Sequence, residues 1–171
     1  MMRFLFPGLT RGTPRGAALF DALVAEARQA HWYLVGKVPD TVDGRFAVLA
    51  TVVALASVRL EHGGAGAQDT AVALTERFIH TMDSEHRQMG VSDPSIGKTV
   101  RKLVRSLERR IDLWRTALDD CDGWDRAAAQ SLFREAAPPT DAAEHCGQHL
   151  RLFWTRLAAL SDEELAEGRL Q

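Results

Sequence analysis

Apolar residues recur along most of the chain at steps of three and four positions, the period of one face of an α-helix. The clearest stripe lies within residues 96–118, opposite a strongly basic face. Its members are Val100, Leu103, Val104, Leu107, Ile111, Trp114 and Leu118. No alternation of apolar and polar residues is long enough for a β-strand. The pattern therefore predicts an all-α protein.

Breaks in this periodicity divide the chain into a bundle of about six helices. They are expected at residues 13–29, 42–62, 68–90, 96–118, 124–136 and 140–160, with a short terminal helix after Ser161. Thr13-Pro14 is a typical helix start, Thr140 or Asp141 is expected to cap the sixth helix, and Ser161 to Glu164 has the capping-box pattern. The helix at 42–62 is apolar on two sides, which predicts a central position in the bundle.

The segment between the first two helices, residues 31–46, is unlike a flexible linker. Trp32 and Tyr33 each have a large aromatic ring with one hydrogen-bonding group. Each ring must be packed in the core or contact a partner. Asp40 is placed to cap the next helix, and Asp43 lies in its first turn, where a carboxylate favours the helix dipole. We expect a structured aromatic elbow, and we refer to residues 31–46 as the elbow.

Two interpretations of the elbow stay open at the level of sequence. In one, Trp32, Tyr33 and Phe46 fill the core of the bundle. In the other, part of this surface receives an apolar helix of a partner. Charged residues near the ends of the second and third helices either pair with one another or fix the polar ends of that partner. These charged residues include Asp43, Arg45, Asp83 and Arg87.

Length and charge narrow the class of protein. A chain of 171 residues is expected to form one domain, with residues 1–12 as a short extension and 13–171 as the helical domain. The formal net charge of -2 excludes a globally basic nucleic-acid binder, and sequence-specific DNA binding is not expected. The start is too short for a secretory signal, and the longest apolar run, Phe46–Val58, is shorter than the about 20 residues that cross a bilayer. We expect a bacterial cytoplasmic protein, peripheral at most to the inner membrane.

The basic face of the fourth helix is the strongest charge imbalance in the chain. Five cations lie opposite the apolar stripe: Lys98, Arg101, Lys102, Arg105 and Arg109. Such a face is either simply solvated or a surface for an anionic partner. Ribosomal RNA, anionic lipid headgroups and an acidic protein segment all satisfy that chemistry.

Catalytic and metal motifs are weak. His145 and His149 are four residues apart and share one helix face, but two ligands do not make a metal site, and the Glu-x-x-His pairs of di-iron bundles do not occur. Nucleophile elbows, phosphate-binding loops and dinucleotide fingerprints are also missing from the sequence. We expect structural or solvent-facing histidines, no cofactor, no metal and no enzymatic activity.

Three ordered motifs carry a family resemblance. They are the elbow, the segment from Met82-Asp83 to Arg87-Gln88-Met89-Gly90-Val91, and Asp93-Pro94-Ser95-Ile96-Gly97-Lys98. Together they resemble the ubiquinol-cytochrome c chaperone family over about Ala17 to Leu118. Ala47 and Pro94 depart from the family pattern, which has an acidic and an apolar residue there.

The resemblance implies an assembly chaperone for newly made cytochrome b of ubiquinol-cytochrome c reductase, respiratory complex III. Family members in mitochondria work near the ribosome that makes this client. The partner-binding candidates are then the elbow residues Trp32, Tyr33, Asp40, Asp43, Arg45 and Phe46, with Met82, Asp83, Arg87 and the five cations of the basic face. Two alternatives remain, a ribosome- or RNA-binding module without a client and a metal- or haem-binding helical enzyme.

Overall fold

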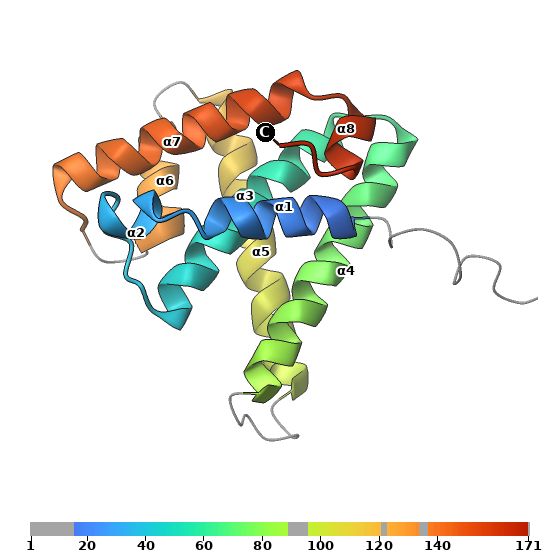
Figure 1. The fold of residues 1–171 in the computed structure, drawn as a ribbon, viewed down its shortest axis with the longest axis horizontal. Helices are drawn as coiled ribbons and strands as arrows, with labels where there is room; N and C mark the ends of the chain where they lie inside the picture. Colours follow the sequence, from blue (N-terminus) through green and yellow to red (C-terminus); the bar gives the residue numbers. More distant parts are fainter. Residues whose placement is uncertain (1–15, 89–95, 121–122, 134–136, 171) are drawn as a thin grey trace, which may run out of the picture.

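The computed structural model describes residues 16–88, 96–120, 123–133 and 137–170. These residues form eight helices and contain no strand, which confirms the all-α prediction (Figure 1). The helices are α1 (Ala17–Ala27), α2 (His31–Leu34), α3 (Val42–Glu61), α4 (Ala65–Gln88), α5 (Ile96–Asp119), α6 (Trp124–Phe133), α7 (Thr140–Ala159) and α8 (Asp162–Ala166). Among the described helices, none is long and apolar enough to span a bilayer.

The middle of the bundle is α3, as its two apolar sides predicted. It packs against α1, α4, α5, α6 and α7, and its residues from Ala47 to Val58 are all buried. Thr51 and Ser57 occur within this buried run, and each hydroxyl donates to the carbonyl four residues earlier in the helix. These bonds satisfy polar groups that would otherwise be costly to bury.

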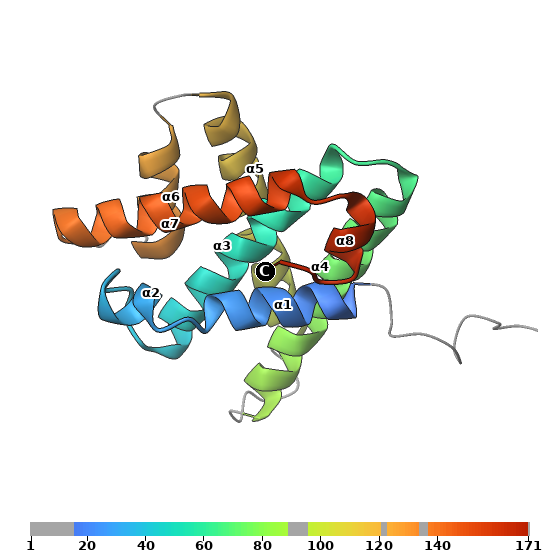
Figure 2. The same cartoon turned by 45° about the horizontal axis from the view of Figure 1, so that its top comes forward.

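Helices α4 and α5 pack against each other and project together from the body of the molecule (Figures 1 and 2). We call this pair the arm. On α5, Leu103, Leu107 and Trp114 of the predicted stripe are buried. Arg110 is buried as well, and its guanidinium donates to the Ser106 carbonyl and hydroxyl and to the Ser131 carbonyl of α6. The arm is therefore anchored to α6 by a charged side chain inside the bundle.

The C-terminal helices close the bundle at the other end of α3. The Arg59 guanidinium donates to the carbonyls of Leu157 and Leu160 and pairs with Asp162 at 3.1 Å. The Asp162 carboxylate also accepts from the Gly64 amide at 2.9 Å. The capping box predicted at Ser161 is present at the start of α8.

Several predicted helix starts need correction. The Thr41 hydroxyl caps α3 by accepting a hydrogen bond from the Gly44 amide, while the Asp40 carboxylate forms an ion pair with Arg45. Neither Thr140 nor Asp141 caps α7, because the helix already includes Thr140 and the N-cap position is Pro139. Helix α4 begins at Ala65, earlier than predicted, because the Gly64 carbonyl accepts from amides of the following turn and starts the helix directly after the glycine pair.

The elbow also holds a short helix, α2, that the periodicity did not predict. The expected extension 1–12, the Thr13-Pro14 start and the helix end at Gly90 lie outside the described residues. The same is true of residues 134–136, which were predicted to end the fifth helix.

Candidate functional site

The elbow is fixed to the end of α1 by two hydrogen bonds from its adjacent rings. The Trp32 indole N–H donates to the Glu26 carbonyl at 3.0 Å, and the Tyr33 hydroxyl donates to the Ala27 carbonyl at 2.7 Å. Trp32 is fully buried, whereas Tyr33 is only half-buried. Trp32 therefore belongs to the core and offers no surface to a partner, while part of Tyr33 remains accessible.

A cleft of about 770 Å³ opens between α1, the elbow, α3 and α4. We call it the elbow cleft. Its lining includes Tyr33, Asp40, Arg45, Phe46 and Met82, all of which the sequence had marked as partner-binding candidates. Further apolar side chains on its wall are Phe20, Val24, Leu34, Val42 and Leu49. Two of these are unusually exposed for aliphatic residues, with Leu34 at 69% and Val42 at 58%.

Charged residues form one edge of the elbow cleft. Asp40 and Arg45 pair at 2.6 Å with both side chains largely exposed, and the hydrogen bond from Arg45 lowers the pKa of the Asp40 carboxyl. The Arg45 guanidinium also lies 5.8 Å from the centre of the Tyr33 ring. An exposed ion pair of this kind adds little to stability. The pair is therefore available for recognition at little cost to the fold.

The floor of the cleft connects to the arm. Phe46 is half-buried, and its ring centre lies 5.9 Å from that of Phe78 on α4 and 5.8 Å from the Arg110 guanidinium of α5. Met82 of α4 is buried beside it in the cleft lining. The cleft thus lies where the elbow meets the root of the arm.

Asp43 and Asp83 lie outside the cleft lining. Asp43 is exposed in the first turn of α3, as predicted, and Asp83 is half-buried on α4. The side chain of Arg87 is not among the described ones. The sequence missed Phe20, Val24, Leu34 and Val42, because an apolar position in a helical stripe gives no sign that it faces a cleft instead of the core.

A second hollow of about 710 Å³ lies between α3, α5 and the start of α8. Its lining includes Arg59, Arg115 and Asp162, which already form ion pairs with groups of the chain. The elbow cleft combines apolar lining with exposed aliphatic side chains, so we take it as the candidate site.

The basic face of α5 is exposed where its side chains are described. Arg101, Lys102, Arg105 and Arg109 all point to solvent on the arm. None of the four forms an ion pair with another described residue. The side chain of Lys98 lies outside the described ones, although its backbone is part of α5. The four cations share one exposed face of α5.

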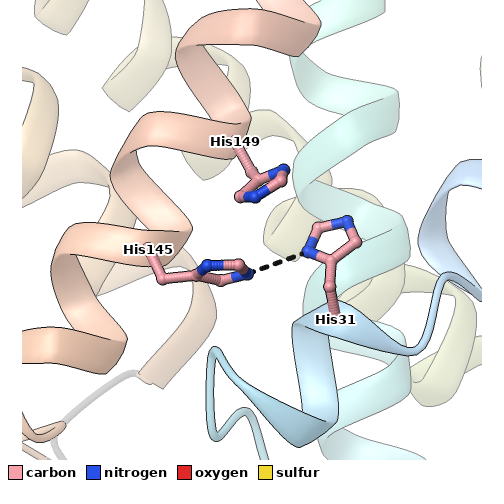
Figure 3. Close-up of side chains that lie close together, drawn as sticks. All are labelled: His31, His145 and His149. Atoms are coloured by element: carbon pink, nitrogen blue, oxygen red, sulfur yellow. Dashed lines mark hydrogen bonds between the residues drawn. The ribbon is translucent and has the colours of Figure 1, made fainter.

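A group of three histidines lies where α2 meets α7 (Figure 3). His31 begins α2, and its Nδ1 lies 3.1 Å from Nε2 of His145 on α7. His149, one turn along α7, stacks on His31 with ring centres 4.1 Å apart. Burial and the two neighbouring rings lower the pKa of His31 to about 4, and burial also lowers that of His149. Sequence had indicated only the α7 pair, since the position of His31 depends on the unpredicted α2.

Comparison with known proteins gives a consistent result. Residues 35–171 match the family model described as ubiquinol-cytochrome C chaperone, which includes the C-terminal third that the three sequence motifs left uncovered. The crystal structure of the Cbp3 homolog from Brucella abortus superimposes with a TM-score of 0.77 at 26% identity, covering 90% of this chain and 85% of that one. Among curated proteins, none matches the chain.

Proposed function

Because the chain belongs to the ubiquinol-cytochrome c chaperone family, we propose that it is a non-enzymatic assembly chaperone of respiratory complex III whose client is newly made cytochrome b. Such a client consists largely of apolar helices that are insoluble until their neighbours dock. The proposal implies work at the cytoplasmic face of a bacterial inner membrane, where those helices are inserted.

The elbow cleft is the observation that carries this proposal. Its apolar wall suits an apolar helix face, and the exposed Asp40–Arg45 pair at its edge suits the polar end of such a helix. Met82 adds an adaptable side chain to the floor, a property that suits surfaces that accept varied apolar partners. Leu34 and Val42 gain most from being covered, because their side chains are the most exposed of the apolar lining.

Deletion of the gene is the first test. We expect the membranes to lose cytochrome b and complex III activity while complex IV in the same membranes stays at its normal level. Equal loss of both complexes would indicate a general defect, and no loss under respiratory growth would refute the proposal.

Variants of the cleft then locate the contact. Leu34→Glu and Val42→Glu place a charge on the apolar wall of the cleft without disturbing the core, because both side chains are exposed. Complementation with either variant is expected to leave complex III well below the wild-type level, with the variant protein still present and folded.

The matched controls are Val72→Glu on α4 and Leu152→Glu on α7. Both positions are 60% exposed and neither lines the elbow cleft. They test whether any added charge at an exposed aliphatic position lowers complex III. If the controls fail as badly as the cleft variants, the client does not use the cleft.

A second role, docking to an anionic surface, is favoured by the four exposed cations on the arm. The cleft and the basic face lie on different parts of the chain, so a chaperone can hold a client and an anionic platform together. A pure RNA-binding module would need only the basic face.

A further inference from the structure

The three histidines between α2 and α7 form a cluster that the proposed chaperone role does not use. We propose that His31, His145 and His149 bind one Zn²⁺ ion through a ring nitrogen each, leaving the fourth position of the ion to water or to a group from outside the chain. This inference does not depend on the identity of the client.

The spacing of the nitrogens fits such an ion. Zinc binds imidazole nitrogen at 2.0–2.1 Å in tetrahedral geometry, which places two nitrogen ligands about 3.3 Å apart. His31 Nδ1 and His145 Nε2 are already 3.1 Å apart, and one nitrogen from each of the three rings lies within 4.8 Å of the others. The remaining adjustment is a side-chain rotation of His149, whose ring is half-exposed and stacked beside the other two.

The chemistry of the donors selects a transition metal. Three imidazoles and no carboxylate make a site for zinc, copper or nickel and a poor one for magnesium or calcium. Cys146 does not compete as a ligand, since its thiol is buried and donates to the Gly36 carbonyl.

The scaffold holds the ligands from two elements. His145 and His149 are one turn apart on the long helix α7, so their relative position is set by the helix. His31 is held by its neighbour Trp32, whose indole bonds to the end of α1, and by the contact of Gly36 with Cys146. A bound ion would therefore join the elbow to α7 at a junction whose described contacts include the His31–His145 hydrogen bond, the Cys146 thiol bond and ring stacking.

The sequence indicates two candidate metal ligands, His145 and His149, and gives no sign of a third ligand. His31 is that ligand, and it lies 114 residues from His145 along the chain. Without an ion, the cluster is a stack of histidine rings in which His31 Nδ1 and His145 Nε2 share a hydrogen bond. A metal site and a metal-free stack of histidine rings can be distinguished by experiment, because only the metal site binds Zn²⁺ stoichiometrically.

The test uses the full chain without an affinity tag, stripped of metal by a chelator and titrated with Zn²⁺ against a chromophoric competitor. We expect one ion per chain at micromolar protein, no binding of Mg²⁺, and a tetrahedral absorption spectrum when Co²⁺ replaces Zn²⁺. Failure of the wild-type protein to bind Zn²⁺ overturns the proposal without any variant.

The deciding variant is His31→Gln, which leaves the α7 pair intact. It should weaken Zn²⁺ binding by more than roughly 10–100-fold, which is the loss of affinity typical of changing a residue that only supports a metal ligand. His145→Gln should do the same, while His80→Gln, an exposed histidine on α4, should bind as the wild type does. Circular dichroism confirms that each variant is folded. Unchanged affinity in His31→Gln would reduce the site to a surface pair on α7 and refute the three-ligand site.

Discussion

Trp32 and Tyr33 are neighbours in sequence with different surroundings. The sequence predicted the same place for both residues, either in the core or against a partner, because each has an aromatic ring with a hydrogen-bonding group. In α2 they project in directions about 100° apart, so the indole enters the core while the phenol reaches the cleft. The choice between the two interpretations depended on a helix of four residues, too short to leave a periodic signal.

Asp162 provides a prediction at the same scale. Its carboxylate accepts from the Gly64 amide and the Arg59 guanidinium, so Asp162→Asn should lower the free energy of unfolding at pH 7 by about 1 kcal/mol. Those hydrogen bonds lower the pKa of Asp162 below its ordinary value of 3.8. The native carboxylate therefore stabilises the fold above that pH, and its contribution is lost as the pH falls through the lower, folded pKa.

Urea unfolding at pH 7, 5 and 3 checks this. The difference in the free energy of unfolding between the wild type and Asp162→Asn should be constant from pH 7 to 5 and should shrink at pH 3. Glu76→Gln, at an exposed position on α4, is the control and should unfold as the wild type does at pH 7. A difference as large at pH 3 as at pH 7 would show that the ionised carboxylate is not the source.

At the scale of elements, periodicity found the six long helices and the central position of α3, because a buried stripe is a local property of the sequence. It failed at several starts. Asp40 had the right residue type for a cap, but Thr41 took that position and Asp40 bonded to Arg45. A residue that could cap a helix can instead pair with a nearby charged side chain. Which of the two interactions forms depends on the three-dimensional arrangement of the residues.

Gly44 in the first turn of α3 gives the element-scale prediction. In an ordinary helix Gly→Ala stabilises by roughly 0.5–1 kcal/mol. A Cβ at Gly44, however, would collide with the backbone carbonyl of Pro39, which cannot move without opening the elbow. Gly44→Ala is therefore expected to destabilise by about 1–3 kcal/mol.

Gly66→Ala in α4 is the matched control. A Cβ at Gly66 meets nothing within 4 Å, so this variant should be as stable as the wild type or more stable by up to about 1 kcal/mol. Thermal unfolding of both variants provides the comparison. If Gly44→Ala and Gly66→Ala changed the stability equally, the close packing of Pro39 against α3 would not explain the glycine at position 44.

At the scale of the whole molecule, the family resemblance and the all-α fold followed from sequence, whereas the elbow cleft and the histidine cluster did not. The cleft needs α1, α3 and α4 to meet, and the cluster needs α2 to face α7. Both depend on contacts between segments far apart in the chain. The basic face was an intermediate case, since helical spacing alone placed its cations together, and the described ones are exposed.

Arg105→Glu with Arg109→Glu tests the basic face. Both side chains are exposed, so the fold should be kept. If the face docks to ribosomes, wild-type binding should weaken steeply with salt, and the slope of log affinity against log salt should fall by roughly 0.7–0.9 for each phosphate that the variant no longer neutralises. Co-sedimentation with ribosomes and with anionic liposomes separates the two surfaces.

Lys37→Glu with Arg126→Glu is the control, because it changes the net charge equally at exposed cations away from the face. Its binding should stay close to that of the wild type. A wild-type protein that binds neither surface at low salt would show the face to be merely solvated, and equal losses in both double variants would show a general effect of charge.

The central position of α3 has a consequence for the synthesis of this chain. Arg59 of α3 reaches the Leu157 carbonyl 98 residues later, and the side of α3 that packs on α6 and α7 stays uncovered until those helices leave the ribosome. At a translation rate of about 5–20 residues per second, that interval is roughly 5–20 s. For that time the nascent chain displays a long apolar helix in water, which is the hazard we propose it later relieves in its client.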